Sequence, residues 1–411
     1  MNDINLPKHW KKIKLSNQDL FNFESGIWKG KKEPLEECTV VRNTNFTSDG
    51  YLDLTDVAVL PIEQRHLVKK SLKWGDIVIE RSGGGPKQPV GRVVFFNLND
   101  AKYCFSNFTS RLRVIDRNTV FPSYLFFFLL YFHDSGQTRQ LQQRTTGIRN
   151  LMFQNYKDTT IPLPPLPEQR AIAHVLQTIQ EAKFTRQREI ALEQERKAAL
   201  MDYLFSHGTK GEPRKRTEIG EIPESWEVTK LGDLLKLKSG VSRPKDIESK
   251  PNAKLTVPVY GGNGILGYTS EKFSDQRLLV IGRVGEYCGC VHIAESPNWI
   301  TDNALYSEKW FSSEILLDFL AGQLKYFNLN RFQRRGGQPL VTQSILHQLK
   351  IPLPPFTEQR AIAAVFQAID EKIAALEREV EHLDELFHAM LDELMTGRRS
   401  AVPLIESGVI Q

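Results

Sequence analysis

The chain has 411 residues, enough for two or three domains that each bury a hydrophobic core. Its hydrophobic fraction of 40% and charged fraction of 25% are ordinary for a folded protein, which excludes wholesale disorder and a fibrous architecture. The net charge of +5 permits a polyanionic partner without demanding one, because the distribution of charge matters more than its sum.

Cysteine usage and hydropathy indicate a cytoplasmic protein. The cysteines at positions 38, 104, 288 and 290 are too few and too scattered for a disulfide framework, so we expect them to be reduced. The N-terminal residues MNDINLPKHWKK lack the apolar core of a secretory signal. The most apolar run, residues 124–132, is far shorter than the roughly 20 residues of a membrane span. We expect it to form a buried helix, and we expect no membrane partner.

The first candidate for ligand contact follows an early strand. Residues 75–79, GDIVI, predict a turn and then a strand, because β-branched residues follow Gly-Asp. Residues 80–92, ERSGGGPKQPVGR, then combine glycines with basic and amide side chains. Glycine lets the backbone approach a phosphate, Arg and Lys can pair with guanine, and Gln can pair with adenine. The candidate DNA contacts are Arg81, Ser82, Gly83, Gly84, Lys87, Gln88 and Arg92. The alternative is a solvated, glycine-rich turn.

A basic segment precedes a proline-rich hinge. Arg144 and Arg149 are candidates for phosphate or base contact, as loops of this composition suit both. In residues 161–165, IPLPP, the prolines prevent a continuous helix and keep the backbone extended. Glu168 then places an acid in the first turn of a long helix, with no breaker before Gly208. About 38 residues give a helix of about 57 Å, which needs a packing partner.

The second half of the chain repeats this order. Residues 278–281, LLVI, predict the matching strand, which runs into Arg283 as the first runs into Arg81. Pairing Gly91-Arg92 with Gly282-Arg283 is an alternative alignment. We interpret the turn at residues 260–264, YGGNG, as the counterpart of residues 80–92. Candidate DNA contacts in this half are Tyr260, Gly262, Asn263, Tyr268, Arg283, Arg334 and Arg335. The alternative for the turn is a tight loop in which Asn263 supplies left-handed backbone.

The two halves are an internal duplication. Residues 161–181 and 351–371 are identical at 15 of 21 positions, at an offset of 190. Pro7 and Trp10 match Pro223 and Trp226 at an offset of 216, which marks the start of each unit. Such a repeat determines the architecture of the whole chain. We divide the chain into a domain at 1–160, a helical spacer at 161–206, a linker at 207–222, a domain at 223–350, a helical spacer at 351–396 and a tail at 397–411.

The long helices carry the pattern of a coiled coil. Phe366, Ile373, Val380, Phe387 and Leu394 recur every seven residues, and a second apolar line lies beside them. The first helix has a more polar seam, because charged residues such as Lys183 and Glu193 interrupt it. We favour one intramolecular antiparallel coiled coil over two helices packed separately on their own domains. The predicted fold class is α+β, with two similar mixed domains separated by two long antiparallel helices and related by a pseudo-twofold.

These motifs resemble the specificity subunit of type I restriction–modification systems over nearly the whole chain. The hinge strings IPLPPLPEQRAIA and IPLPPFTEQRAIA resemble the two helical regions of that family, and residues 207–226 are similar to its inter-domain segment. GDIVIERSGG at 75–84 resembles its first variable domain, whereas YGGNGILGYTS at 260–270, GRVGEYCG at 282–289 and TDNALY at 301–306 resemble its second.

The resemblance implies two target-recognition domains that each read half of a bipartite, asymmetric site in double-stranded DNA. It also implies that two modification (methyltransferase) subunits, and then restriction (translocase–nuclease) subunits, dock on the chain. The identical hinge residues suit either docking of two like partners or fastening of hinge to helix, and we slightly favour fastening. They are Glu168, Gln169, Arg170, Glu358, Gln359 and Arg360.

We find no catalytic motif. The Asn-Pro-Pro-aromatic motif of adenine methyltransferases, the Gly-x-Gly-x-x-Gly loop and the phosphate-binding loop are all absent from the sequence. We therefore expect no cofactor or metal in this chain, with S-adenosylmethionine, ATP and Mg²⁺ bound by partner subunits. The competing hypotheses are a non-catalytic, rod-like scaffold that spaces two protein-binding domains, and a stand-alone enzyme.

Overall fold

The computed structural model describes residues 6–30, 32–85, 88–99, 102–145, 148–332 and 339–408. The chain forms two compact units, which we call unit 1 (residues 1–186 and 379–411) and unit 2 (residues 187–378). Both boundaries fall inside long helices, so each unit holds one mixed domain and a part of each helix. Our division of the chain assigned each helix to a single spacer, whereas the structure shares both helices between the units.

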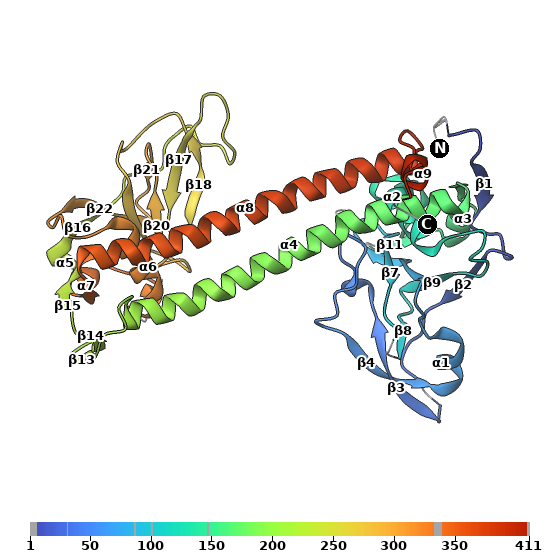
Figure 1. Cartoon of the computed structure of the whole chain (residues 1–411), viewed down its shortest axis with the longest axis horizontal. Coiled ribbons are helices and arrows are strands. Elements are labelled where there is room, and N and C mark those ends of the chain that lie inside the picture. The colour runs from blue at the N-terminus through green and yellow to red at the C-terminus, as the bar shows by residue number, and fades with distance from the viewer. Residues whose placement is uncertain are drawn as a thin grey trace. The chain divides into compact units, whose positions relative to one another are not determined.

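Unit 1 is built from three layers. The apolar helix α2 covers one face of the sheet β2-β9-β5-β7, and the smaller sheet β4-β3-β8 covers the other (Figure 1). The elements are β1 (Lys11–Lys14), β2 (Phe21–Ser25), β3 (Leu35–Val41), the 3-10 helix η1 (Asn43–Asn45), β4 (Ala58–Glu63), α1 (Gln64–Lys70), β5 (Asp76–Glu80), β6 (Ser82–Gly84), β7 (Val93–Phe96), β8 (Tyr103–Phe105), β9 (Thr109–Val114), α2 (Pro122–Asp134), η2 (Gln137–Leu141), β10 (Gln142–Thr145), β11 (Ile148–Leu151), α3 (Phe153–Lys157), β12 (Thr160–Leu163), the start of α4 (Leu166–His207), the end of α8 (Phe356–Met395) and α9 (Val402–Glu406).

Unit 2 repeats this plan with a four-stranded sheet β16-β22-β19-β20 and a three-stranded sheet β18-β17-β21. Its elements are β13 (Arg214–Thr217), β14 (Gly220–Pro223), β15 (Glu227–Lys230), α5 (Leu231–Leu234), β16 (Leu235–Ser239), β17 (Val257–Gly261), β18 (Gly264–Thr269), β19 (Leu278–Gly282), β20 (Val291–Ala294), β21 (Trp299–Ile300), β22 (Ala304–Trp310), α6 (Leu317–Tyr326), η3 (Leu329–Phe332), α7 (Gln343–His347) and β23 (Lys350–Leu353), with the end of α4 and the start of α8.

The central strands explain why the layers form. Along β5, Ile77 and Ile79 pack with α2, while Val78 points into the second sheet, because successive side chains alternate across a strand. In β19, Leu279 and Val280 divide in the same way. A strand buried on both faces reads as an unbroken apolar run, which is what the sequence shows at both places. The expected buried helix at residues 124–132 is confirmed as part of α2.

The sheet order decides how the two halves correspond. Strands β5 and β19 hold the same position, and each is followed by an arginine. The carbonyl of Arg81 accepts a hydrogen bond from Leu151 N at 2.7 Å, and that of Arg283 accepts one from Val341 N at 2.9 Å. Arg81 therefore matches Arg283, and the alternative alignment through Arg92 is wrong.

One predicted correspondence is wrong. The turn at Gly262 and Asn263 joins β17 to β18, whose counterparts by sheet order are β3 and β4. Its equivalent in unit 1 is therefore the connection of residues 42–57. The counterpart of residues 80–92 is the stretch that joins β19 to β20. The two loops were matched because both residues 80–92 and the turn at 260–264 are rich in glycine, and glycine content does not reveal which strands a loop joins.

Helices α4 and α8 are continuous over 42 and 40 residues, as the absence of breakers predicted. The polar seam of α4 is matched by opposite charges on α8. Within unit 1, Lys183 pairs with Asp384 and Arg186 Nε lies 2.6 Å from Glu379 Oε2. Within unit 2, Lys372 Nζ lies 2.5 Å from Glu193 Oε1, and Lys197 pairs with Asp370. In each unit, residues further along α4 pair with residues earlier in α8, so the two helix segments run antiparallel. The helices therefore pack on each other as well as on their domains.

The segment between α4 and β15 is more ordered than a linker. Strands β13 and β14 form an antiparallel hairpin, in which Arg214 pairs with Pro223 and Thr217 pairs with Gly220. Arg214 also forms an ion pair with Glu221, in which Nη2 lies 3.1 Å from Oε2. The basic run at residues 214–216 is thus partly used in this hairpin.

Candidate nucleic-acid interface

Arg81 and Arg283 lie at matched positions in the two units and make the same contact. Arg81 Nη1 donates to Ser25 Oγ at 3.2 Å, and Arg283 Nη1 donates to Ser239 Oγ at the same distance. Each serine is the last residue of an edge strand of the same sheet, β2 or β16, which one strand separates from β5 or β19. A guanidinium has five N–H donors, so this bond orients the group and leaves donors for a ligand. Arg81 also lies over the Phe153 ring, 4.3 Å from its centroid, and partial burial lowers the pKa of its guanidinium.

Arg92 is held inside unit 1. Its Nε and Nη2 donate to the two carboxylate oxygens of Glu80, each at 2.9 Å, and Glu80 is 1% exposed. Its guanidinium also donates to the carbonyls of Asn43 and Phe46 at 3.0 and 3.3 Å. The donors that a guanine contact would need are therefore engaged. Gln88 is exposed beside Arg92, and its amide oxygen faces the guanidinium in the orientation that satisfies both groups.

Asn43 is a residue of this site that the sequence interpretation missed. Its Nδ2 donates to Glu80 Oε1 at 3.1 Å and to Ser82 O at 3.3 Å. Gly83 has a φ of +100°, and a Cβ there would lie 2.7 Å from Asn43 Nδ2, so a side chain at this position would strain the backbone and displace Asn43. The polar string RNTN directly after an apolar strand was the available signal. In unit 2 the corresponding segments meet through their backbones, because a Cβ on Gly282 would lie 2.6 Å from the carbonyl oxygen of Gly262.

A short sheet carries the other candidates of unit 1. Strand β11 lies between β10 and β6, and pairs Arg149 with Gly84 and with Arg144. Ser82 Oγ donates to Asn150 Oδ1 at 2.5 Å. Arg149 Nη1 donates to Gln142 Oε1 at 3.4 Å. The structure thus brings the basic segment before the hinge beside the glycine-rich segment after β5. Lys87, Arg334 and Arg335 lie outside the described residues.

In unit 2 the turn candidates separate into a buried and an exposed group. Tyr260 is 6% exposed, and this burial raises the pKa of its phenol, so it belongs to the core. Asn263 is exposed at the tip of the hairpin, and Tyr268 is half-buried in β18. Gly264, with a φ of +90°, supplies the left-handed backbone that we had considered for Asn263. The exposed Asn263 amide remains a candidate for base contact.

Gln169 and Gln359 make the same set of three hydrogen bonds to the backbone, and we call each set the latch. Gln169 Nε2 donates to the carbonyls of Pro164 and Thr119, while its Oε1 accepts from Phe121 N. Gln359 does the same with Pro354, Glu314 and Leu316, and both glutamines are fully buried. These contacts support the fastening role that we favoured for the glutamines.

The repeated glutamates bind the repeated tryptophans. Trp10 Nε1 donates to Glu168 Oε2 at 3.1 Å, and Trp226 Nε1 donates to Glu358 Oε2 at 3.2 Å. Glu168 and Glu358 are 3% and 2% exposed, so these bonds satisfy buried carboxylates. Arg170 and Arg360, by contrast, are exposed. The docking role therefore stays a prediction for the two arginines.

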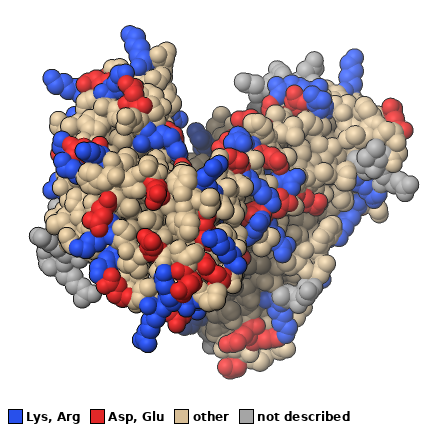
Figure 2. All heavy atoms as spheres, turned by 60° about the vertical axis from the view of Figure 1, so that its left-hand side comes forward, with Lys and Arg blue, Asp and Glu red and all other residues tan. Residues whose placement is uncertain are grey.

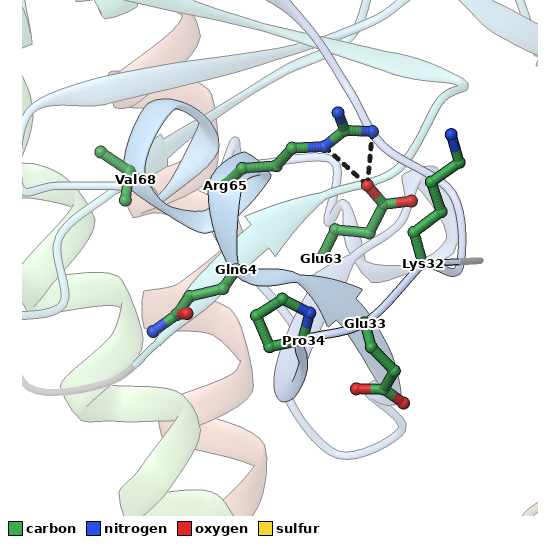
Figure 3. Close-up of a pocket in the computed structure, with 7 residues that line it drawn as sticks. All are labelled: Lys32, Glu33, Pro34, Glu63, Gln64, Arg65 and Val68. Carbon is green, nitrogen blue, oxygen red and sulfur yellow. Dashed lines mark hydrogen bonds and ion pairs between the residues drawn. The ribbon is translucent and has the colours of Figure 1, made fainter.

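Two further features of the described residues bear on a ligand site, the charged surface and one depression. On the face drawn in Figure 2, Lys and Arg are interspersed with Asp and Glu and do not form one continuous basic patch. A depression of about 420 Å³ at the start of α1 contains Lys32 and Val68, and its Arg65 is paired with Glu63 (Figure 3). Among the described residues, no helix combines the length and apolarity needed to cross a bilayer, and no cluster of His, Cys, Asp and Glu has metal-binding geometry.

Comparison with known proteins gives one consistent family. The sequence pattern described as "Type I restriction modification DNA specificity domain" matches residues 7–194 and again residues 223–384. The chain is 28% identical over 368 residues to the putative type I restriction enzyme MjaX specificity subunit of Methanocaldococcus jannaschii, covering 85% of each protein. It is 32% identical over 142 residues to the EcoprrI specificity subunit of Escherichia coli, covering 34% of this chain and 35% of that one. The fold resembles the type I S subunit of M. genitalium, with a TM-score of 0.62 at 17% identity over 96% of this chain and 97% of that one.

Proposed function

We propose that this chain, which belongs to the type I restriction–modification DNA specificity family, reads a bipartite, asymmetric target in double-stranded DNA. Each unit contributes one recognition domain, and each domain reads one half-site. The chain does no chemistry itself: adenine methylation or cleavage is carried out by subunits that it directs. The observation that carries this proposal is the duplicated frame, in which Arg81 and Arg283 make the same serine contact beside loops of different sequence.

The division between repeated and divergent parts supports the proposal. The hinge and latch are the same in both units, down to the three hydrogen bonds of Gln169 and Gln359. The loops around the two arginines differ in length and composition. A repeated latch suits two copies of one partner, whereas different loops suit two different half-sites.

The partners follow from the family. Two modification subunits dock along the helices, with the exposed Arg170 and Arg360 as contacts, and restriction subunits join them. The partners bind S-adenosylmethionine, ATP and Mg²⁺, and the complex acts in the cytoplasm.

Paired arginine variants test the proposal. Arg81→Ala in the assembled complex should relax one position of one half-site, and Arg283→Ala one position of the other, each by about 5- to 100-fold. Methylome sequencing measures both half-sites in a single experiment. The alternative function, a scaffold that spaces two protein-binding domains, predicts that the complex shows no salt-dependent DNA binding in a filter-binding titration.

A further inference from the structure

The connection of residues 42–57 makes unit 1 different from unit 2. In unit 1 this connection joins β3 to β4, whereas in unit 2 a turn of Gly262 and Asn263 joins the corresponding strands β17 and β18. The longer connection in unit 1 begins beside residues 80–85 and 88–92, which we call the candidate reading loop. There, Asn43 contacts Glu80 and Ser82. We call residues 46–52 within it the anchor segment.

The anchor segment is bound to helix α4 by three hydrogen bonds. Tyr51 Oη donates to Gln180 Oε1 at 2.9 Å, and Gln180 Nε2 donates to the carbonyl of Asp49 at 2.9 Å. Lys183 Nζ donates to Asp49 Oδ2 at 3.0 Å. Gln180 is only 4% exposed, and burial together with the nearby Glu181 and Asp49 carboxylates raises the pKa of the Tyr51 phenol. These are buried or half-buried bonds, so their loss leaves polar groups without partners.

Gly50 packs the anchor segment against α2 and β7. Its φ is +78°, and a Cβ there would lie 2.5 Å from Phe126 Cζ of α2. Its carbonyl accepts from Phe95 N of β7 at 3.1 Å. The anchor segment is therefore clamped between α2, β7 and α4, and its backbone has little freedom to shift.

The same segment borders the candidate reading loop. Arg92 Nη1 donates to the carbonyl of Phe46 at 3.3 Å. Thr47, Ser48, Gln88 and Arg92 are among the residues that line a cavity of about 380 Å³. A continuous set of contacts thus runs from Gly83 and Glu80 through residues 42–52 to Gln180 and Lys183. Lys183 also pairs with Asp384 of α8, so the contacts end on the antiparallel helix pair.

We propose that the anchor segment is a positioning element for base reading by unit 1, with Asp49, Tyr51, Gln180 and Lys183 as positioning residues. It holds residues 80–85 and 88–92 at a fixed place on the helix pair that carries the partner subunits. Recognition of the first half-site then depends on the helix contact, while recognition of the second does not. This inference rests on the proposed function.

The test compares two carboxylates that bind the same lysine. Asp49→Asn combined with Gln180→Ala removes the ion pair of Asp49 with Lys183 and both hydrogen bonds of Gln180 to the anchor segment. Asp384→Asn leaves these contacts and removes the ion pair of Lys183 with α8. Each variant of the full chain is assembled with its modification subunits and given DNA libraries randomised in one half-site at a time. Methylation of each mismatched sequence is measured relative to the cognate sequence.

The double variant should lower discrimination at the half-site of unit 1 by about fivefold or more, because a mismatched base pair is rejected only while the reading groups are held in place. Discrimination at the other half-site should not change, and Asp384→Asn should change neither. Hydrogen exchange of residues 46–52 should rise in the double variant. If that variant does not assemble, Tyr51→Phe, which removes a single bond, should produce a smaller shift in the same direction.

Two results would overturn the inference. The first is faster exchange of residues 46–52 with discrimination unchanged, which would make the anchor segment purely structural. The second is an equal loss at both half-sites or in Asp384→Asn, which would assign the effect to the helices. If the unaltered chain confers no sequence preference at either half-site, the proposed function itself fails, and that outcome is distinct from both.

Discussion

The ion pair of Glu80 and Arg92 separates a structural role from a reading role. Arg92→Met keeps the length of the side chain and removes its charge, which leaves the 1% exposed Glu80 carboxylate with Asn43 Nδ2, at 3.1 Å, as its one remaining side-chain donor. Removing one partner of a buried pair costs about 3–5 kcal/mol, and the partial exposure of Arg92 points to the lower end, about 3 kcal/mol. For a unit of this size, that corresponds to a melting temperature about 6–12 °C lower.

The double variant Glu80→Gln and Arg92→Met should recover more than half of this loss, because no buried charge then remains unpaired. Hydrogen exchange of the β5 and β7 amides measures the local free energy of opening in the full chain. A loss below about 1 kcal/mol, or a double variant no more stable than Arg92→Met, would refute this reasoning. Loss of one base preference without loss of stability would instead restore Arg92 as a base-reading residue.

Three further predictions concern the latch, a helix end and the second reading turn. Gln169→Leu and Gln359→Leu should each cost about 3 kcal/mol in urea unfolding, since each breaks one buried and two half-buried hydrogen bonds to backbone groups, and a difference above about 1 kcal/mol would contradict their equivalence. Gly208→Ala places a Cβ 2.5 Å from Glu358 Oε1 and should lower the melting temperature more than Gly211→Ala, which has a φ of +62° and open space around it; equal losses would show that Glu358 moves freely. Asn263→Ala should relax one position of the second half-site by about 5- to 100-fold in methylome sequencing, and an unchanged motif would return this residue to a turn role.

The features that the sequence predicted well depend on local patterns. An offset of 190 between near-identical strings reveals a duplication, the absence of glycine and proline gives two long helices, and apolar runs give buried strands and α2. The charged positions of the first helix seam were harder to interpret, because the opposite charges that explain them lie on a helix 173 to 201 residues away. Lys183 with Asp384 is such a pair.

The candidate site was predicted less completely, because its contacts are non-local. Arg92 matched a base-reading pattern, yet its partners Glu80 and Asn43 are positioned by the sheet and not by sequence neighbours. The turn at Asn263 was assigned to the wrong loop of the other half, since glycine content does not reveal strand order. The anchor segment left no recognisable pattern, because its role arises from the fold that brings Asp49 to Lys183.

The central claim is that the two domains read DNA independently on a shared frame. Replacing residues 1–160 with the first domain of another family member, while keeping the hinge and both helices, tests it in a host that carries the modification subunits. We predict a methylome in which one half-site changes and the other half-site and the spacing between them stay the same. A change in both half-sites, or in neither, would contradict the account.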